Sequence, residues 1–121
     1  MVTRFDVPAG DSAAFLPGAQ AALTAFAACR GYLRGRVGRA ADDPTAWVLT
    51  TEWDGVGSYR RSLGAYDVKV HAAPLLSLGR DEASAFEVLA SDEGAAPSRR
   101  AADADSAAIG GSSAPSVPTD V

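Results

Sequence analysis

The sequence contains a single cysteine, Cys29, and a single histidine, His71, among 121 residues. One cysteine cannot form an internal disulfide, and the absence of such bonds is typical of a reducing compartment, so we expect a cytoplasmic protein. One histidine and one cysteine far apart in the chain are also too few ligands for a zinc site. The thiol itself is interpreted first as a small buried side chain near a helix end.

Long apolar runs and an excess of basic residues are also missing. The longest apolar runs, such as Ala21-Ala22-Leu23, are far shorter than the ~18 residues that span a bilayer. No apolar signal-peptide core precedes the first strand-like segment, so export is not expected. Net charge is −4, and residues 1–90 hold nine Lys and Arg against ten Asp and Glu. We therefore expect neither a membrane partner nor a nucleic-acid partner, because nucleic-acid binders present a basic surface.

The composition changes near residue 90. Residues 91–121 have only Ile109, Val117 and Val121 as larger apolar side chains, and hold two Lys and Arg against five Asp and Glu. Such a segment cannot bury enough apolar surface to offset the entropy of ordering it. We predict one domain over residues 1–90 and a disordered acidic tail, rich in Ala, Ser and Pro, over residues 91–121.

Alternation of apolar and other side chains with period two predicts four strands. They cover residues 2–7, 31–39, 46–54 and 84–89. The second and third are joined by the turn-forming stretch ADDP and should pair as an antiparallel hairpin, with Arg34 or Arg36 opposite Glu52. Strict alternation along residues 31–39 also places Leu33, Gly35 and Val37 on one face. The opposite face then carries Tyr32, Arg34, Arg36 and Gly38.

Two segments show helical spacing. The first covers residues 12–28, with Asp11 as N-cap and Arg30 and Gly31 at its end. Its apolar stripe consists of Phe15, Ala19, Ala22, Leu23 and Phe26. Pro17 predicts either a kink or a short turn before a helix that begins near that residue.

The second helical segment has apolar residues at spacings of three and four. They are Val56, Tyr59, Leu63, Tyr66 and Val70. Gly64 is a point at which the helix could divide, and Pro74 should end it. The order strand, helix, strand, strand, helix, strand predicts an α+β, ferredoxin-like βαββαβ fold, a four-stranded antiparallel sheet with both helices on one face. Apolar side chains on both faces of the central strands favour dimerisation through the uncovered face.

Three stretches resemble the antibiotic biosynthesis monooxygenase (ABM) family. They are GYLRGRVGRAADDPTAWVLTTEWD, VGSYRRSLGAYDVKVHAAPLL and SAFEVL, and the resemblance covers residues 2–89. It implies a dimeric α+β barrel in which two ferredoxin-like sheets meet face to face, with a pocket between sheet and helices in each protomer. Some members oxidise polycyclic phenols with molecular oxygen and no metal or flavin, and others bind and degrade haem.

The haem-degrading branch has an asparagine in the first strand, a tryptophan in the second helix, and an iron-binding histidine ten residues later. His71 falls at the histidine position. Position 61 is Arg61, however, and the first strand offers Asp6 but no asparagine. The resemblance therefore disfavours haem, and we expect no cofactor and no metal.

His71 is the first candidate for a catalytic residue. It shares a helical face with Arg60 and Asp67, and Asp67 at i−4 could orient the imidazole and raise its basicity. As a base, His71 would convert a small aromatic or polyketide-like substrate to an anion that reduces oxygen itself. Arg61 or Arg60 would steady that anion. The side chains expected to line the substrate pocket are Trp53, Tyr59 and Tyr66.

Each candidate also has an ordinary structural interpretation. His71 could be a partly exposed helix residue with a routine i,i+4 pair. Tyr59 and Tyr66 lie on the predicted core stripe, Trp53 could pack the sheet, and the arginines could form a solvated helix face. The alternative to an oxygenase is thus a non-catalytic dimeric barrel that binds a small apolar ligand or acts as a scaffold.

Overall fold

The computed structural model describes residues 1–94, of which Met1–Glu87 form one compact unit. Residues 88–94 contain no helix or strand. The predicted acidic tail lies, from residue 95 onward, outside the described residues. In the described part of the chain, no helix is both long enough and apolar enough to cross a membrane.

Three antiparallel strands form the sheet of this unit, in the order β1-β3-β2. They are β1 (Val2–Asp6), β2 (Tyr32–Ala40) and β3 (Asp43–Trp53). Along β1, Thr3 and Phe5 are buried whereas Val2, Arg4 and Asp6 are exposed, so the predicted alternation is confirmed. The hairpin of β2 and β3 is confirmed too: Arg34 lies opposite Glu52 and forms an ion pair with it.

The predicted alternation of β2 is wrong at its first residues. The register of β2 against β3 shifts between Tyr32 and Arg34. Tyr32 pairs with Trp53 and packs against the core on the same side as Val37, whereas Leu33, predicted to share the face of Val37, is 57% exposed. The physical reason is a β-bulge, because an extra residue in one strand moves the side chains before it to the other face.

Residues 84–89, predicted as a fourth strand, form no strand in the described chain. Residues 80–84 nevertheless lie along the free edge of β1, because Arg80 N donates to Arg4 O at 2.8 Å and Val2 N donates to Ser84 O at 2.7 Å. These two hydrogen bonds run antiparallel to β1. The same segment forms ion pairs with β1 through Arg4–Glu82 and Arg80–Asp6, both at 2.8 Å.

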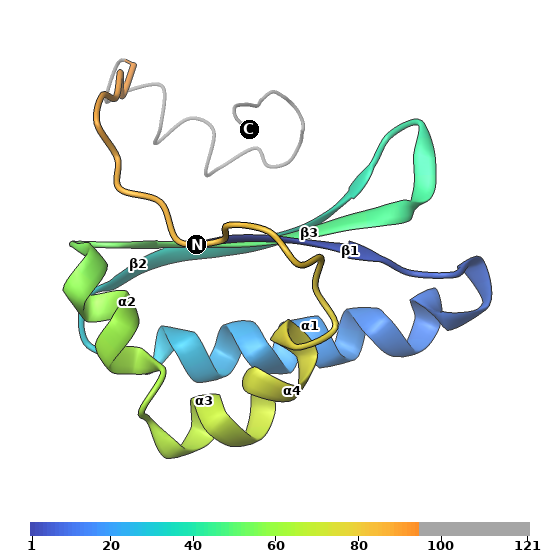
Figure 1. Ribbon diagram of the computed structural model, residues 1–121, viewed down its shortest axis with the longest axis horizontal. Helices are drawn as coiled ribbons and strands as arrows, with labels where there is room; N and C mark the ends of the chain where they lie inside the picture. Colours follow the sequence, from blue (N-terminus) through green and yellow to red (C-terminus); the bar gives the residue numbers. More distant parts are fainter. Residues whose placement is uncertain (95–121) are drawn as a thin grey trace. The chain divides into compact units, whose positions relative to one another are not determined.

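Within Met1–Glu87 all the helices lie on one side of the sheet (Figure 1). They are the 3-10 turn η1 (Ala9–Asp11), α1 (Ser12–Ala27), α2 (Val56–Ser62), α3 (Tyr66–His71) and α4 (Ala73–Leu76). The stripe predicted for α1 is confirmed, with Ala19, Ala22 and Phe26 fully buried. Asp11 occupies the N-cap position, without a side-chain capping bond, and Pro17 lies inside a helix that begins before it.

The second helical segment is divided into three short helices. α2 ends at Ser62 and α3 begins at Tyr66, so the break predicted at Gly64 is confirmed. The continuous core stripe is confirmed at Tyr59 but wrong from Leu63 onward, because Leu63, Tyr66 and Val70 are 40%, 78% and 44% exposed. Ser62 and Val68 are buried instead. A turn between two helices resets the helical phase, and the spacing before it no longer determines which face is buried. Pro74 lies in the first turn of α4, where proline is tolerated, and does not simply end the segment.

Candidate functional site

Four aromatic side chains form a cluster between the sheet and the helices, which we call the aromatic cluster. Its members are Phe26 from α1, Tyr32 from β2, Trp53 from β3 and Tyr59 from α2. The Trp53 ring lies 5.8 Å from Phe26, 5.4 Å from Tyr32 and 5.9 Å from Tyr59. Trp53 Nε1 also donates to Thr51 Oγ1 at 2.7 Å. Two of the predicted pocket-lining residues, Trp53 and Tyr59, are therefore brought together.

The phenols of this cluster are held in their neutral form. Burial raises the pKa of both Tyr32 and Tyr59 above the ordinary tyrosine value of 10.0. The cause is desolvation, which disfavours the phenolate. Both hydroxyls therefore keep their protons to a higher pH than an exposed tyrosine would.

Gly31, in the loop between α1 and β2, holds the end of β3 and the start of α2 close to the end of α1. Gly31 has a φ of 89°, in the left-handed region that favours glycine, and its carbonyl accepts a hydrogen bond from Asp54 N at 2.8 Å. Ser58 Oγ in turn donates to the Asp54 carboxylate. A Cβ on Gly31 would lie 2.6 Å from Ser58 Cβ. The close approach fixes the end of β3 and the start of α2 against the end of α1.

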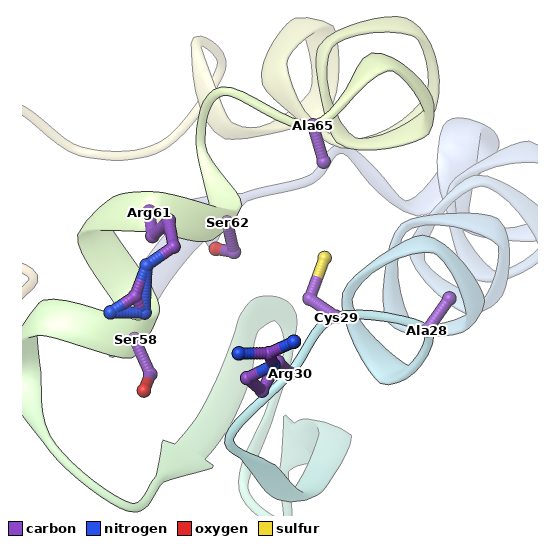
Figure 2. Close-up of a pocket in the computed structure, with 7 residues that line it drawn as sticks. All are labelled: Ala28, Cys29, Arg30, Ser58, Arg61, Ser62 and Ala65. Carbon is purple, nitrogen blue, oxygen red and sulfur yellow. The ribbon is translucent and has the colours of Figure 1, made fainter.

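A pocket of about 260 Å³ lies beside this junction, and we call it the α1–α2 pocket. Figure 2 shows the side chains that line it: Ala28, Cys29, Arg30, Ser58, Arg61, Ser62 and Ala65. Of the predicted site residues, Arg61 alone is among them. Arg30 and Cys29 were expected only to end α1, because no sequence spacing could connect them to a helix some thirty residues further on.

The other predicted residues lie elsewhere on the helices. His71 and Asp67 are both on α3, four residues apart as predicted, and both are exposed. No hydrogen bond connects these two side chains in residues 1–94, and His71 does not line the α1–α2 pocket. Tyr66 and Arg60 are exposed as well. In a single chain the predicted site is therefore dispersed, and the catalytic role of its residues stays a prediction.

A second pocket, of about 320 Å³, lies at the sheet. It is lined by Arg4, Gly38, Arg39, Ala40, Ala46, Trp47, Val48 and Arg80. Its arginines are already engaged: Arg4 binds Glu82, Arg80 binds Asp6, and the Arg39 guanidinium lies 5.5 Å from the centroid of the Trp47 ring. Each of the three arginines that line this pocket already has a partner, so none is left unpaired to bind an anionic ligand.

Metal ligands are not gathered in the described residues. Across residues 1–94 no group of three or more His, Cys, Asp and Glu side chains could hold a metal ion. The functional groups that the structure does bring together are aromatic rings, neutral phenols, guanidinium groups and one thiol.

The sequence profile of the family "Antibiotic biosynthesis monooxygenase" matches residues 1–73, which is more than half of the chain. The protein therefore belongs to the ABM family, and its fold is the α+β, ferredoxin-like fold of that family. No protein with a curated description matches the chain.

Solved structures of similar fold come from several organisms. A mutant of SnoaB from Streptomyces nogalater, a cofactor-independent oxygenase, is 28% identical, with a TM-score of 0.57 over 65% of this chain and 80% of SnoaB. Rv0793 from Mycobacterium tuberculosis is 17% identical, with a TM-score of 0.59 over 78% of this chain and 95% of its own. A conserved protein from Methanosarcina mazei Go1 is 20% identical, with a TM-score of 0.57 over 68% and 80% of the two chains. The last two likenesses show the fold alone.

Proposed function

We propose that this protein is a cofactor-independent monooxygenase that acts on a small aromatic or polyketide-like substrate. The observation that carries the proposal is the likeness to SnoaB, at 28% identity over 65% of this chain, in a member of the same family. SnoaB is described as a cofactor-independent oxygenase. The aromatic cluster adds support, because its edge-to-face and tilted rings beside the helices provide an apolar surface that suits a planar substrate.

In the proposed reaction the substrate supplies the electrons. A base removes a proton from an activated CH₂ or phenol, and the resulting anion reduces O₂ directly. For an anthrone, one oxygen atom replaces the two hydrogens of the CH₂ group as a carbonyl and the other leaves as water. The protein has three tasks: to remove the proton, to stabilise the anion, and to bind the substrate ring in an apolar environment.

These tasks are assigned to the residues predicted from the sequence. His71 is the base, since an exposed imidazole can exchange the proton with water. Asp67, one turn earlier on α3, orients it. Arg61, with Arg60 beside it, stabilises the negative charge of the substrate anion. The substrate ring lies on the helical side of the sheet, flanked by Trp53, Tyr59 and Tyr66.

We also propose that the protein forms a homodimer through the outer face of its sheet, the face opposite the helices. In Met1–Glu87 every helix lies on the other side, and outward-facing Val48 is only partly buried. A second sheet on this face would give the dimeric barrel that the family resemblance implies. We also propose that the protein is cytoplasmic, as its sequence suggests.

A non-catalytic dimeric barrel, acting as a binding protein or scaffold, is the second candidate. One observation favours it: His71 is exposed and does not line the α1–α2 pocket. Haem is no part of either proposal, because Arg61 and Asp6 stand where the haem-degrading branch has tryptophan and asparagine.

The test is oxygen consumption by the purified protein with a panel of anthrones and hydroquinones, without added metal or flavin. The oxygenase predicts catalytic consumption of one O₂ per anthrone converted, at a rate proportional to protein concentration. A scaffold predicts no consumption above the spontaneous rate with any member of the panel.

A further inference from the structure

The α1–α2 pocket has an unbalanced charge. Two of its seven lining residues are arginines and none is Asp or Glu. The ion pairs of the described chain are Arg4–Glu82, Arg34–Glu52 and Arg80–Asp6, so neither Arg30 nor Arg61 has a carboxylate partner within residues 1–94. The nearby Asp54 carboxylate is engaged by Ser58 Oγ. Two guanidinium groups from different elements therefore border one small space (Figure 2).

The remaining polar groups of the pocket already donate to the protein. Ser62 Oγ donates to Tyr59 O at 2.5 Å, and Cys29 Sγ donates to Ala25 O at 3.6 Å. The donors left for a ligand are thus the N–H groups of the two arginines. A guanidinium presents parallel N–H groups in a planar fork, which matches the two oxygens of a carboxylate.

Size and lining restrict the rest of the ligand. At about 260 Å³ the pocket is smaller than typical drug-binding sites, which begin near roughly 300 Å³. Ala28 and Ala65 contribute methyl groups, and the Cys29 sulfur points into the gap between Ser62 and Ala65 (Figure 2). A ligand whose apolar part is about the size of one ring would fit this pocket.

We infer that the α1–α2 pocket binds a small organic carboxylate, with Arg30 and Arg61 holding the carboxylate and Cys29 beside the apolar body. The site shares Arg61 with the proposed oxygenase site but excludes His71. Its occupancy is measured without any turnover. Failure of the oxygen-consumption experiment would leave it untouched.

Benzoate is the probe, and benzamide is its neutral counterpart of nearly equal shape. Titration calorimetry should show saturable binding of benzoate and none of benzamide. Arg30→Gln and Arg61→Gln should each weaken benzoate binding about tenfold, because each removes a charge-assisted contact. Arg36→Gln makes the same change of charge on β2, outside the pocket, and should leave binding unchanged. Equal thermal stability of the three variants excludes misfolding as the cause.

Cys29 reports where the ligand binds, because it is the only cysteine in the chain. Its thiol loses a proton to water, and the resulting thiolate displaces iodide from iodoacetamide to form a carbon–sulfur bond. Benzoate should slow this alkylation, whereas benzamide should not. Iodoacetate, which carries a carboxylate itself, should lose rate relative to iodoacetamide in Arg61→Gln.

Three results would overturn the inference. One is the absence of saturable benzoate binding, and another is equal weakening in Arg36→Gln, which would mean a general effect of charge. The third is benzoate binding that leaves alkylation of Cys29 unchanged, which would place the ligand elsewhere. Should Cys29 resist both reagents, the calorimetric comparison of the three arginine variants decides the question alone.

Discussion

The Trp53 ring lies 5.9 Å from the Tyr59 ring, and this contact connects the last residue of β3 to α2. Tyr59 also lies 6.3 Å from Phe26 of α1, so one side chain contacts both layers of the fold. The position of α2, and with it that of Arg61, depends on this packing. The aromatic cluster is therefore as important for the geometry of the candidate site as for the stability of the core.

The buried phenols should make the protein sensitive to alkali. Burial raises the pKa of Tyr32 and Tyr59 in the folded state, so the unfolded chain loses these protons first as the pH rises past 10.0. Their contribution is fully present below that pH and is lost as pH rises through the folded pKa. We expect the free energy of unfolding, measured with urea, to fall above pH 10 and to fall less steeply in Tyr59→Phe. An equally steep fall in the variant would contradict this account of Tyr59.

Glycine should be required at position 31 and dispensable at position 57. Gly31→Ala forces a side chain into the left-handed region and against Ser58 and Asp54. The backbone strain alone costs roughly 1–3 kcal/mol. Gly57→Ala is the matched control, because Gly57 lies inside α2 with open space around it; there alanine should stabilise the protein by about 0.5–1 kcal/mol. Urea denaturation that ranks the two variants the other way would show that the α1–β2 loop is wrongly described.

Acid should loosen the segment that lies along β1. Hydrogen bonds from Arg80 and from Arg4 lower the pKa of Asp6 and of Glu82 respectively. This contribution is present above the unfolded pKa of a carboxylate, near 4, and is lost as pH falls through the folded value. Arg80→Ala should therefore lower the melting temperature slightly at pH 7, and by progressively less as the pH falls through the folded pKa of Asp6. Arg36→Ala, which removes a charge outside these pairs, should show no such pH dependence. The pairs are exposed, so 1 M salt should also remove most of the effect.

The sequence predicted those parts of the fold that depend on local periodicity. Alternation was sufficient for β1, and for the hairpin that places Arg34 opposite Glu52. It could not predict the bulge at Tyr32, because a register shift depends on how two strands meet. Spacing likewise predicted a break at Gly64, but not the direction in which α3 turns afterwards, which exposes Tyr66 and buries Val68.

Less of the candidate site than of the fold could be predicted from the sequence. The α1–α2 pocket joins Cys29 and Arg30 to Ser58 and Arg61, and only tertiary packing brings these pairs together. The predicted fourth strand fails for a similar reason. Its alternation is present in the sequence, but a strand also needs a partner, and in the described chain the pairing with β1 ends at Ser84.

The dimer can be tested by placing a charge on the outer face of the sheet. Val48→Glu should give a monomer in sedimentation at micromolar concentration, because a buried unpaired carboxylate is strongly unfavourable in an interface. Leu63→Glu carries the same charge at an exposed position on the helical side and should remain dimeric. A wild-type protein that sediments as a 12.3 kDa monomer would refute the barrel outright.

The most direct test of the central claim compares oxygen consumption by wild type, His71→Ala and Lys69→Ala on the best substrate of the panel. Lys69 is exposed on α3 two residues from His71, so its substitution controls for damage to the helix. The oxygenase with His71 as base predicts a loss of roughly 10²–10⁴-fold in His71→Ala, with Lys69→Ala close to wild type. Full activity in His71→Ala would contradict the assignment of the base, and no activity in any of the three would favour the scaffold.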